Sequence, residues 1–202
     1  MKRILTIALA LTLTLGMNAQ NAVKAKQILD KTAAIVSNKG GASASFTINS
    51  KKTGNTSGTI LIKGNKFHAT TPQASVWYNG KTMWTYMKNS DEVNVSTPSE
   101  GQQAQLNPYH FINLYKKGYT MSMKNVKGGY EVHLVAQNAK QPVKEMYITV
   151  NSRTYLPMTV KMLQGGAWTT VTISKFKAMN LSDTKFTFNS KDYPHAEVID
   201  LR

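Results

Sequence analysis

The sequence predicts a mainly β protein with a few helices, in which one antiparallel sheet is curled as a barrel or part of one. The first observation is the stretch from Val76 to Met87, where aromatic and β-branched residues flank Asn79-Gly80, a strong signal for a β-hairpin. The second is that short apolar runs alternate with turn residues about every 8–12 positions. The third is that both faces of the hairpin are apolar, so each face is covered or one lines a cavity.

A two-residue turn at the Asn-Gly pair would set Val76 opposite Met83. Because side chains alternate along a strand, Val76 and Met83 would share one face of the sheet, and Trp77 and Trp84 the other. The pattern leaves open which of these two faces would line a cavity.

Residues 1–19 have the pattern of a secretory signal peptide. Lys2 and Arg3 form its basic start, the apolar segment that follows is too short to span a membrane, and Ala19 offers a cleavage site. No cysteine follows this segment, so lipid cannot be attached there. We expect an exported, soluble mature chain that forms a single domain over residues 20–202.

The elements expected along the mature chain are one amphipathic helix, a long series of strands and one short helix among them. Residues 22–37 have apolar side chains at helical spacing, and Gly40-Gly41 ends this helix. Asn107 and Pro108 begin the short helix, which ends before Gly118. The expected strands cover residues 42–50, 59–63, 67–70, the hairpin, 93–96, 119–124, 130–135, 143–150, 156–163 and 167–176, with a last strand around Phe186 and Phe188 before a tail.

Composition narrows the chemistry that the chain can perform. Its 202 residues include 25 Lys and Arg, 10 Asp and Glu and no Cys, which excludes disulfides and thiolate chemistry. The four His lack metal-ligand spacing, and the acids form no pair suited to acid–base catalysis. We therefore expect no metal, no cofactor and no enzymatic activity. The net charge of +15 suits an anionic partner or only solubility, and without a run of about five or six basic residues we expect no nucleic acid partner.

Methionine is an abundant apolar residue of the mature chain. The sequence has ten Met, of which eight follow residue 19. Met side chains are flexible and polarisable, and they are over-represented on surfaces that accept varied apolar partners. The same residues would also fill an ordinary core, and the sequence leaves both interpretations open.

Several stretches resemble the motifs of one known family. Residues 79–86, Asn-Gly-Lys-Thr-Met-Trp-Thr-Tyr, are similar to its Asp-Gly-Lys-Thr-Leu-Trp-x-Tyr hairpin. Residues 58–67 resemble its Gly-x-Leu-x-x-Lys-Arg-Pro-Gly-Lys-Phe strand, and residues 107–112 its short Asn-x-Pro-Phe-x-Leu helix. Residues 185–188 and 196–200 fit its terminal Phe-x-Phe and Val-Asp pattern. In this order, behind a signal peptide, the motifs resemble LolA, the family of periplasmic carriers of outer-membrane lipoproteins.

This resemblance implies an unclosed (half) antiparallel β-barrel of about eleven strands, with helices covering the concave side. Acyl chains would lie between sheet and helices. The residues expected to line this lipid-binding cavity are Ile60, Ile62, Phe67, Met83, Met146, Ile148, Met158 and Val160. Sequence alone does not decide whether Ile60 and Ile62, or Leu61 between them, face inward, because a one-residue slip inverts the set.

The resemblance also implies a lid over the cavity. The lid would be the short helix at residues 108–115, with Phe111, Ile112 and Leu114 turned inward. In the family an arginine on the second strand tethers this lid, and Lys63 stands at its position. Lysine keeps the charge but lacks the planar fork of the guanidinium group.

The function that the resemblance implies is transport of lipoproteins through the periplasm by a monomer. Its partners would be the acyl chains of the lipoproteins, an ATP-driven exporter in the inner membrane, and an outer-membrane acceptor, which is either a LolB-like protein or the membrane itself. An alternative is a related half-barrel protein that binds another lipid or glycolipid, or that senses envelope stress.

Overall fold

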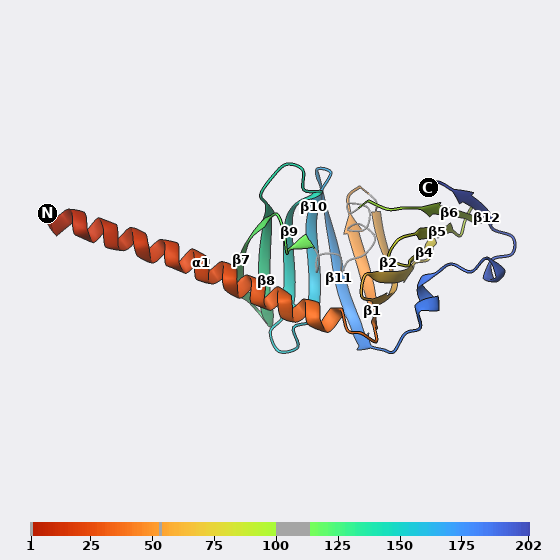
Figure 1. Ribbon diagram of the computed structural model, residues 1–202, viewed down its shortest axis with the longest axis horizontal. Helices are drawn as coiled ribbons and strands as arrows, with labels where there is room; N and C mark the ends of the chain where they lie inside the picture. The colour runs from red at the N-terminus through yellow and green to blue at the C-terminus, as the bar shows by residue number, and fades with distance from the viewer. Residues whose placement is uncertain (1, 53, 100–113) are drawn as a thin grey trace.

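The computed structural model describes residues 2–52, 54–99 and 114–202, with the backbone alone for residues 2–18. In these ranges the chain forms one α-helix, two short 3-10 helices and twelve strands. Helix α1 (Lys2–Val36) lies along one side of the sheet, and its N-terminal part extends beyond the sheet (Figure 1). Among the described residues no helix is both long and apolar enough to cross a membrane.

All twelve strands belong to one curled sheet. Its strands are β1 (Ala42–Ser50), β2 (Gly54–Lys63), β3 (Lys66–Thr70), β4 (Ala74–Tyr78), β5 (Met83–Met87), β6 (Glu92–Ser96), β7 (Tyr119–Val126), β8 (Gly129–Ala136), β9 (Val143–Asn151), β10 (Pro157–Gln164), β11 (Ala167–Ala178) and β12 (Glu197–Asp200). Their order is β12-β6-β5-β4-β3-β2-β1-β11-β10-β9-β8-β7. Strands β1 to β11 pair antiparallel with their neighbours, whereas β12 joins β6 in parallel. Because β12 and β7 stand at opposite ends of this order, the sheet is not closed, and the predicted half-barrel is confirmed.

Helix α1 is amphipathic over the part that packs against the sheet. Ala25, Ile28, Leu29, Thr32 and Val36 are buried and recur at helical spacing, as predicted for residues 22–37. The helix contacts β7 and β8. The observed helix begins at Lys2, so the expected signal peptide and its cleavage site after Ala19 lie within it and stay predictions.

The glycines after α1 allow the chain to turn tightly against the sheet. A Cβ on Gly40 would lie 2.6 Å from the carbonyl oxygen of Met179, closer than real Cβ atoms come. Gly41 has φ +96° and would bring a Cβ equally close to the carbonyl oxygen of Ile62. The predicted helix end therefore also fixes where β1 enters the sheet.

The hairpin keeps its predicted faces but not its predicted register. Tyr78 lies opposite Met83, and Trp77 lies opposite Trp84, two residues away from the expected pairing. The two central residues are Gly80 and Lys81, because Asn79 pairs with Thr82 (Asn79 N to Thr82 O, 3.2 Å) and its side chain accepts from both Lys81 N and Thr82 N. Asn79 thus precedes the turn, and Gly80, with φ +99°, stands at the first central position, as glycine does in type II′ turns.

The C-terminal region differs from the prediction of a last strand at Phe186 and Phe188. Residues 181–193, called the C-terminal strap below, contain two 3-10 helices, η1 (Asp183–Phe186) and η2 (Ser190–Asp192). The side chains of Leu181 and Phe186, both within the strap, are buried. The chain then forms strand β12 within the expected tail. The alternating Phe-Thr-Phe pattern reflects anchoring of a loop rather than strand pairing.

A side chain of α1 forms hydrogen bonds with the outer edge of strand β7. Asn21 donates from Nδ2 to the carbonyl oxygen of Met123 (2.9 Å) and accepts from Met123 N (2.6 Å). This pair of bonds is the one that a neighbouring strand would make, so the amide of Asn21 covers part of an otherwise open sheet edge.

We expect an Asn21→Ala variant to lose about 1–3 kcal/mol of unfolding free energy, because two hydrogen bonds at about 0.5–1.5 kcal/mol each are removed. The backbone amide of Met123 should also exchange faster with deuterium. Amide exchange and urea unfolding measure both effects, with Gln20→Ala as the control. Unchanged exchange at Met123 would contradict this function of Asn21.

Candidate functional site

The candidate site is the inner face of the sheet, defined as the face whose side chains pack with α1 in one apolar core. Ile60 and Ile62 belong to this core and are 1% and 3% exposed, whereas Leu61 is half-buried on the outer face. The structure thus settles the parity that the sequence left open. Ile60, Ile62, Phe67 and Met83 share this face in the half formed by β2–β5.

Two rows of side chains cross the inner face of this half. Backbone pairing aligns the first row as Ala44, Ile60, Ala69, Val76 and Thr85. The second row runs beside the first, and its members are Ala42, Ile62, Phe67, Tyr78 and Met83. The first row has small side chains at two of its five positions, while the second carries two aromatic rings. This difference in side-chain size suits a floor on which an extended apolar chain could lie across the strands.

The other half of the site lies on β9 and β10. Met146, Ile148 and Val160 are at most 1% exposed and belong to the same core as α1. Met158 departs from this pattern, because it is the extra residue of a β-bulge between Pro157 and Thr159 and is only half-buried. The eight expected cavity residues therefore fall into two groups on the same face, with Met158 at the end of a strand.

The predicted lid lies mostly outside the described residues, which include neither Phe111 nor Ile112. Leu114 and Tyr115 are described, and both are buried in the core. The hydroxyl of Tyr115 donates to Asp30 Oδ1 of α1 at 2.5 Å. Burial and this carboxylate raise the pKa of Tyr115, while Lys26 and Tyr115 lower the pKa of Asp30. This bond ties the chain just before β7 to the helix.

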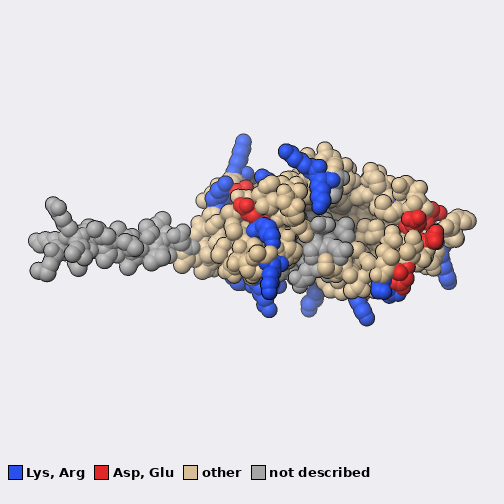
Figure 2. Space-filling model, turned by 90° about the horizontal axis from the view of Figure 1, so that it is seen from above, with Lys and Arg blue, Asp and Glu red and all other residues tan. Residues whose placement is uncertain are grey.

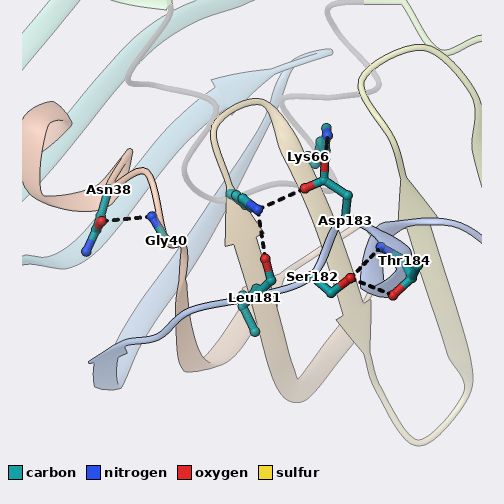
Figure 3. A network of polar contacts seen from close by, with 8 residues as sticks. Asn38, Gly40, Lys66, Leu181, Ser182, Asp183 and Thr184 are labelled. Atoms are coloured by element: carbon teal, nitrogen blue, oxygen red, sulfur yellow. Dashed lines mark hydrogen bonds and ion pairs between the residues drawn. The ribbon is translucent and has the colours of Figure 1, made fainter.

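Lys63, the expected lid latch, binds Leu181 and Asp183 of the C-terminal strap, two residues that are labelled in Figure 3. Its Nζ donates to the carbonyl oxygen of Leu181 at 2.7 Å and forms an ion pair with Asp183 at 2.9 Å. Lys66 pairs with the other oxygen of Asp183 at 2.7 Å, so hydrogen bonds from Lys66 and Lys63 lower the pKa of that carboxyl. Lys63 alternates with Ile62 and is paired opposite Lys66, which places it on the outer face. Its role as a latch for the lid stays a prediction.

The outer face of β3 and β4 carries an aromatic cluster that the sequence analysis did not assemble. His68 stacks on Trp77 with 4.7 Å between ring centroids, and Tyr193 of the strap meets Trp77 at 5.6 Å. Burial lowers the pKa of His68, and the charge of Lys185 lowers it further. The cluster could not be found from local patterns, because Tyr193 of the strap lies more than one hundred residues after Trp77 in the sequence.

This lowered pKa predicts a pH dependence of stability. As the pH falls below about 6.5, the unfolded state takes up a proton on His68 while the folded state resists it, so the melting temperature should fall. A His68→Gln variant should lose this part of the pH dependence between about pH 7.5 and pH 5. His195→Gln, at an exposed position of the tail, serves as the control. A profile identical in the His68 variant and the parent would refute this assignment.

The charged groups form no metal site in the described part of the chain and no basic stripe on the face shown in Figure 2. No group of three or more His, Asp or Glu in the described part of the chain could hold a metal ion. On the face shown in Figure 2, Lys and Arg side chains project from several separate places. The basic side chains on this face, which contribute to the net charge of +15, are therefore dispersed rather than aligned.

The sequence matches a family model described as outer membrane lipoprotein carrier protein LolA over residues 15–166. This match covers well over half of the 202 residues. It begins at residue 15, within α1, and ends in the turn between β10 and β11. No curated protein matches the sequence.

Solved structures share the architecture at low sequence identity. An uncharacterized conserved protein from Thermus thermophilus has a TM-score of 0.59 and 13% identity, over 88% of this chain and 99% of that one. A domain described as an outer membrane lipoprotein-sorting protein, from Vibrio parahaemolyticus, has a TM-score of 0.50 and 10% identity, over 83% and 97%. A DUF1329 family protein from Desulfovibrio piger has a TM-score of 0.50 and 13% identity, over 83% and 97%. At such identities these likenesses show the fold alone.

Proposed function

The chain belongs to the LolA family of outer membrane lipoprotein carrier proteins, and we propose that it carries lipoproteins between two membranes. The observation that carries this proposal is the apolar inner face, which is continuous from β2 to β10 in a sheet that never closes. An open sheet leaves its inner face accessible from the side, whereas a closed barrel admits a ligand through its mouth. We propose the periplasm as the site of action, reached through the signal peptide at residues 1–19.

The ligands would be acyl chains held against the inner face. An acyl chain of about fifteen methylenes gains roughly 12 kcal/mol on leaving water, at about 0.8 kcal/mol for each group. Two or three such chains, fully buried, would exceed the practical affinity limit of about 18–21 kcal/mol. The inner face therefore holds them incompletely, and they do not escape alone into water. Unloading then needs direct contact with an acceptor.

The methionines of the inner face suit such incomplete binding. Met83, Met146 and Met162 are buried there, and Met121 and Met123 pack against the same core. Because Met side chains repack at low cost, they can fit acyl chains of different length without one fixed arrangement.

The proposed partners follow from this mechanism. The donor is an ATP-driven exporter of the inner membrane, and the acceptor is a LolB-like protein or the outer membrane itself. The predicted lid at Phe111, Ile112 and Leu114 and the latch at Lys63 belong to this proposal. The chain acts as a monomeric carrier and needs no cofactor.

The deciding experiment is release of a triacylated lipoprotein from isolated inner membranes by the purified mature chain. We expect the lipoprotein to appear in solution in a one-to-one complex with the carrier, detected by gel filtration and mass spectrometry. A soluble fraction without lipoprotein would refute the carrier function. If the purified chain instead yields a free lipid or glycolipid in the mass spectrum, the alternative of a related half-barrel protein with another ligand is favoured.

A further inference from the structure

A cavity of about 770 Å³ lies on the outer face of the sheet, between β3–β4 and the C-terminal strap. The sheet itself separates this cavity from the inner face. His68 and Trp77 come from the strands. The strap supplies the remaining lining residues, which are Asp183, Thr184, Lys185, Thr187, Phe188, Asn189, Asp192 and Tyr193.

Aromatic rings form the apolar part of this lining. Phe188 and Tyr193 approach Trp77 edge-on, with ring centroids 5.5 and 5.6 Å apart, and Phe188 lies 5.3 Å from Tyr193. Trp77 is 6% exposed, whereas Phe188 and Tyr193 are half-buried and keep part of their surface at the cavity. Such rings give a ligand flat apolar surface at little cost in conformational entropy.

The polar part of the lining comes from the strap and is close to neutral. Asp192 and Lys185 carry opposite charges, and Asp183 is already paired with Lys63 and Lys66. Thr184, Thr187 and Asn189 add uncharged groups; the side-chain oxygen of Asn189 accepts from Lys191 N at 3.2 Å, a bond that does not use its NH₂ group. A cavity with this balance favours neither a strong anion nor a strong cation.

Docking of the strap accounts for the contacts of Phe188 and Tyr193 with Trp77. It does not account for the part of these two rings that stays exposed, nor for the exposed side chain of Asp192. The strap is held by buried Leu181 and Phe186 and by the bonds from Lys63 and Lys66, while Thr187 and Asn189 are exposed. We propose that the cavity binds a neutral saccharide, whose ring faces pack on aromatic side chains and whose hydroxyls bond to the polar rim. This site is independent of the lipid-carrier function and lies on the opposite face of the sheet.

The test uses Trp77 as a reporter of the cavity. In the mature chain with Trp84→Phe and Trp168→Phe, Trp77 is the remaining tryptophan of the three. We expect the soluble β-1,4-linked disaccharide of N-acetylglucosamine, or maltose, to change its fluorescence saturably, with a dissociation constant of about 1 mM or tighter. No change with either saccharide at about ten times that concentration would overturn the proposal.

Two conservative substitutions at the polar rim show whether the saccharide binds in this cavity. Thr187→Val and Asp192→Asn remove single polar functions from exposed positions and should each weaken binding about two- to tenfold. The control is Thr120→Val, at an exposed position of β7, which should leave the affinity unchanged. Unchanged affinity in both rim variants, with melting temperatures equal to the parent, would overturn the assignment. Lipoprotein release by the same variants should be unaffected, which separates this site from the carrier function.

A third arm distinguishes two sources of the same chemistry. The disaccharide probe stands for a free sugar, and purified cell-wall glycan sedimented with the chain tests a polymeric one. Binding to either supports the saccharide site if Asp192→Asn weakens it. Sedimentation that is unaffected by Asp192→Asn would contradict binding of glycan in this cavity.

Discussion

An Ile60→Ala variant is expected to lose about 2–5 kcal/mol of unfolding free energy, because the substitution removes buried methyl groups and leaves a cavity. Ile60 is 1% exposed and lies between Ala44 and Ala69 in a row of the inner face. Urea unfolding followed by tryptophan fluorescence measures the loss.

The adjacent residue provides the matched control. Leu61 has a similar volume but lies half-buried on the outer face, opposite His68. A Leu61→Ala variant should therefore lose less than about half as much unfolding free energy. A half-buried side chain already contacts water, so its truncation loses less transfer free energy and leaves a smaller cavity. Equal losses in the two variants would contradict the assignment of the inner face. The same pair of variants tests the cavity residues Ile62, Phe67 and Met83, since all follow from one strand parity.

The sequence predicted this face as a set but not its orientation. Alternation along β2 showed that Ile60 and Ile62 go together and that Leu61 opposes them. Which set packs inward depends on the pairing of β2 with β1 and β3 and on the position of α1, and these are long-range contacts. A local pattern shows which side chains share a face of the strand, whereas the contacts with neighbouring strands decide which face points inward.

The hairpin shows the same distinction on a smaller scale. Its faces were predicted correctly because a shift of two residues preserves alternation. Its register was wrong because Asn79 uses its side chain to accept two backbone N–H groups, which moves the turn to Gly80 and Lys81. An Asn-Gly pair can thus be read as two central turn residues or as one flanking and one central residue.

The C-terminal strap marks the limit of the sequence analysis. Two of its anchors, Leu181 and Asp183, bond to Lys63 and Lys66 of β2 and β3, which lie more than one hundred positions earlier. No local periodicity signals such a contact. The strap also gives Lys63 partners on the outer face that no local pattern could predict, and its place as the latch of the family stays a prediction.

An Ala69→Trp variant is expected to abolish release of lipoprotein from membranes while the sheet still folds. Ala69 is 6% exposed and lies on the inner face between Ile60 and Val76. A bulky indole placed there would occupy the floor on which we propose that acyl chains lie. If this region accommodates acyl chains, it can rearrange around the ring, and the overpacking cost should stay near the lower end of about 1–3 kcal/mol.

The matched control is Thr59→Trp, one residue before Ile60, at an exposed position of the outer face. It introduces the same side chain without reaching the inner face and should release lipoprotein like the parent. The outcome for Ala69→Trp separates two kinds of interior. An adaptable site gives a folded protein that carries no cargo, because the ring and the acyl chain compete for one space. A rigid, fully packed core cannot admit the ring without large destabilisation, so extensive unfolding of this variant would contradict an acyl-binding inner face.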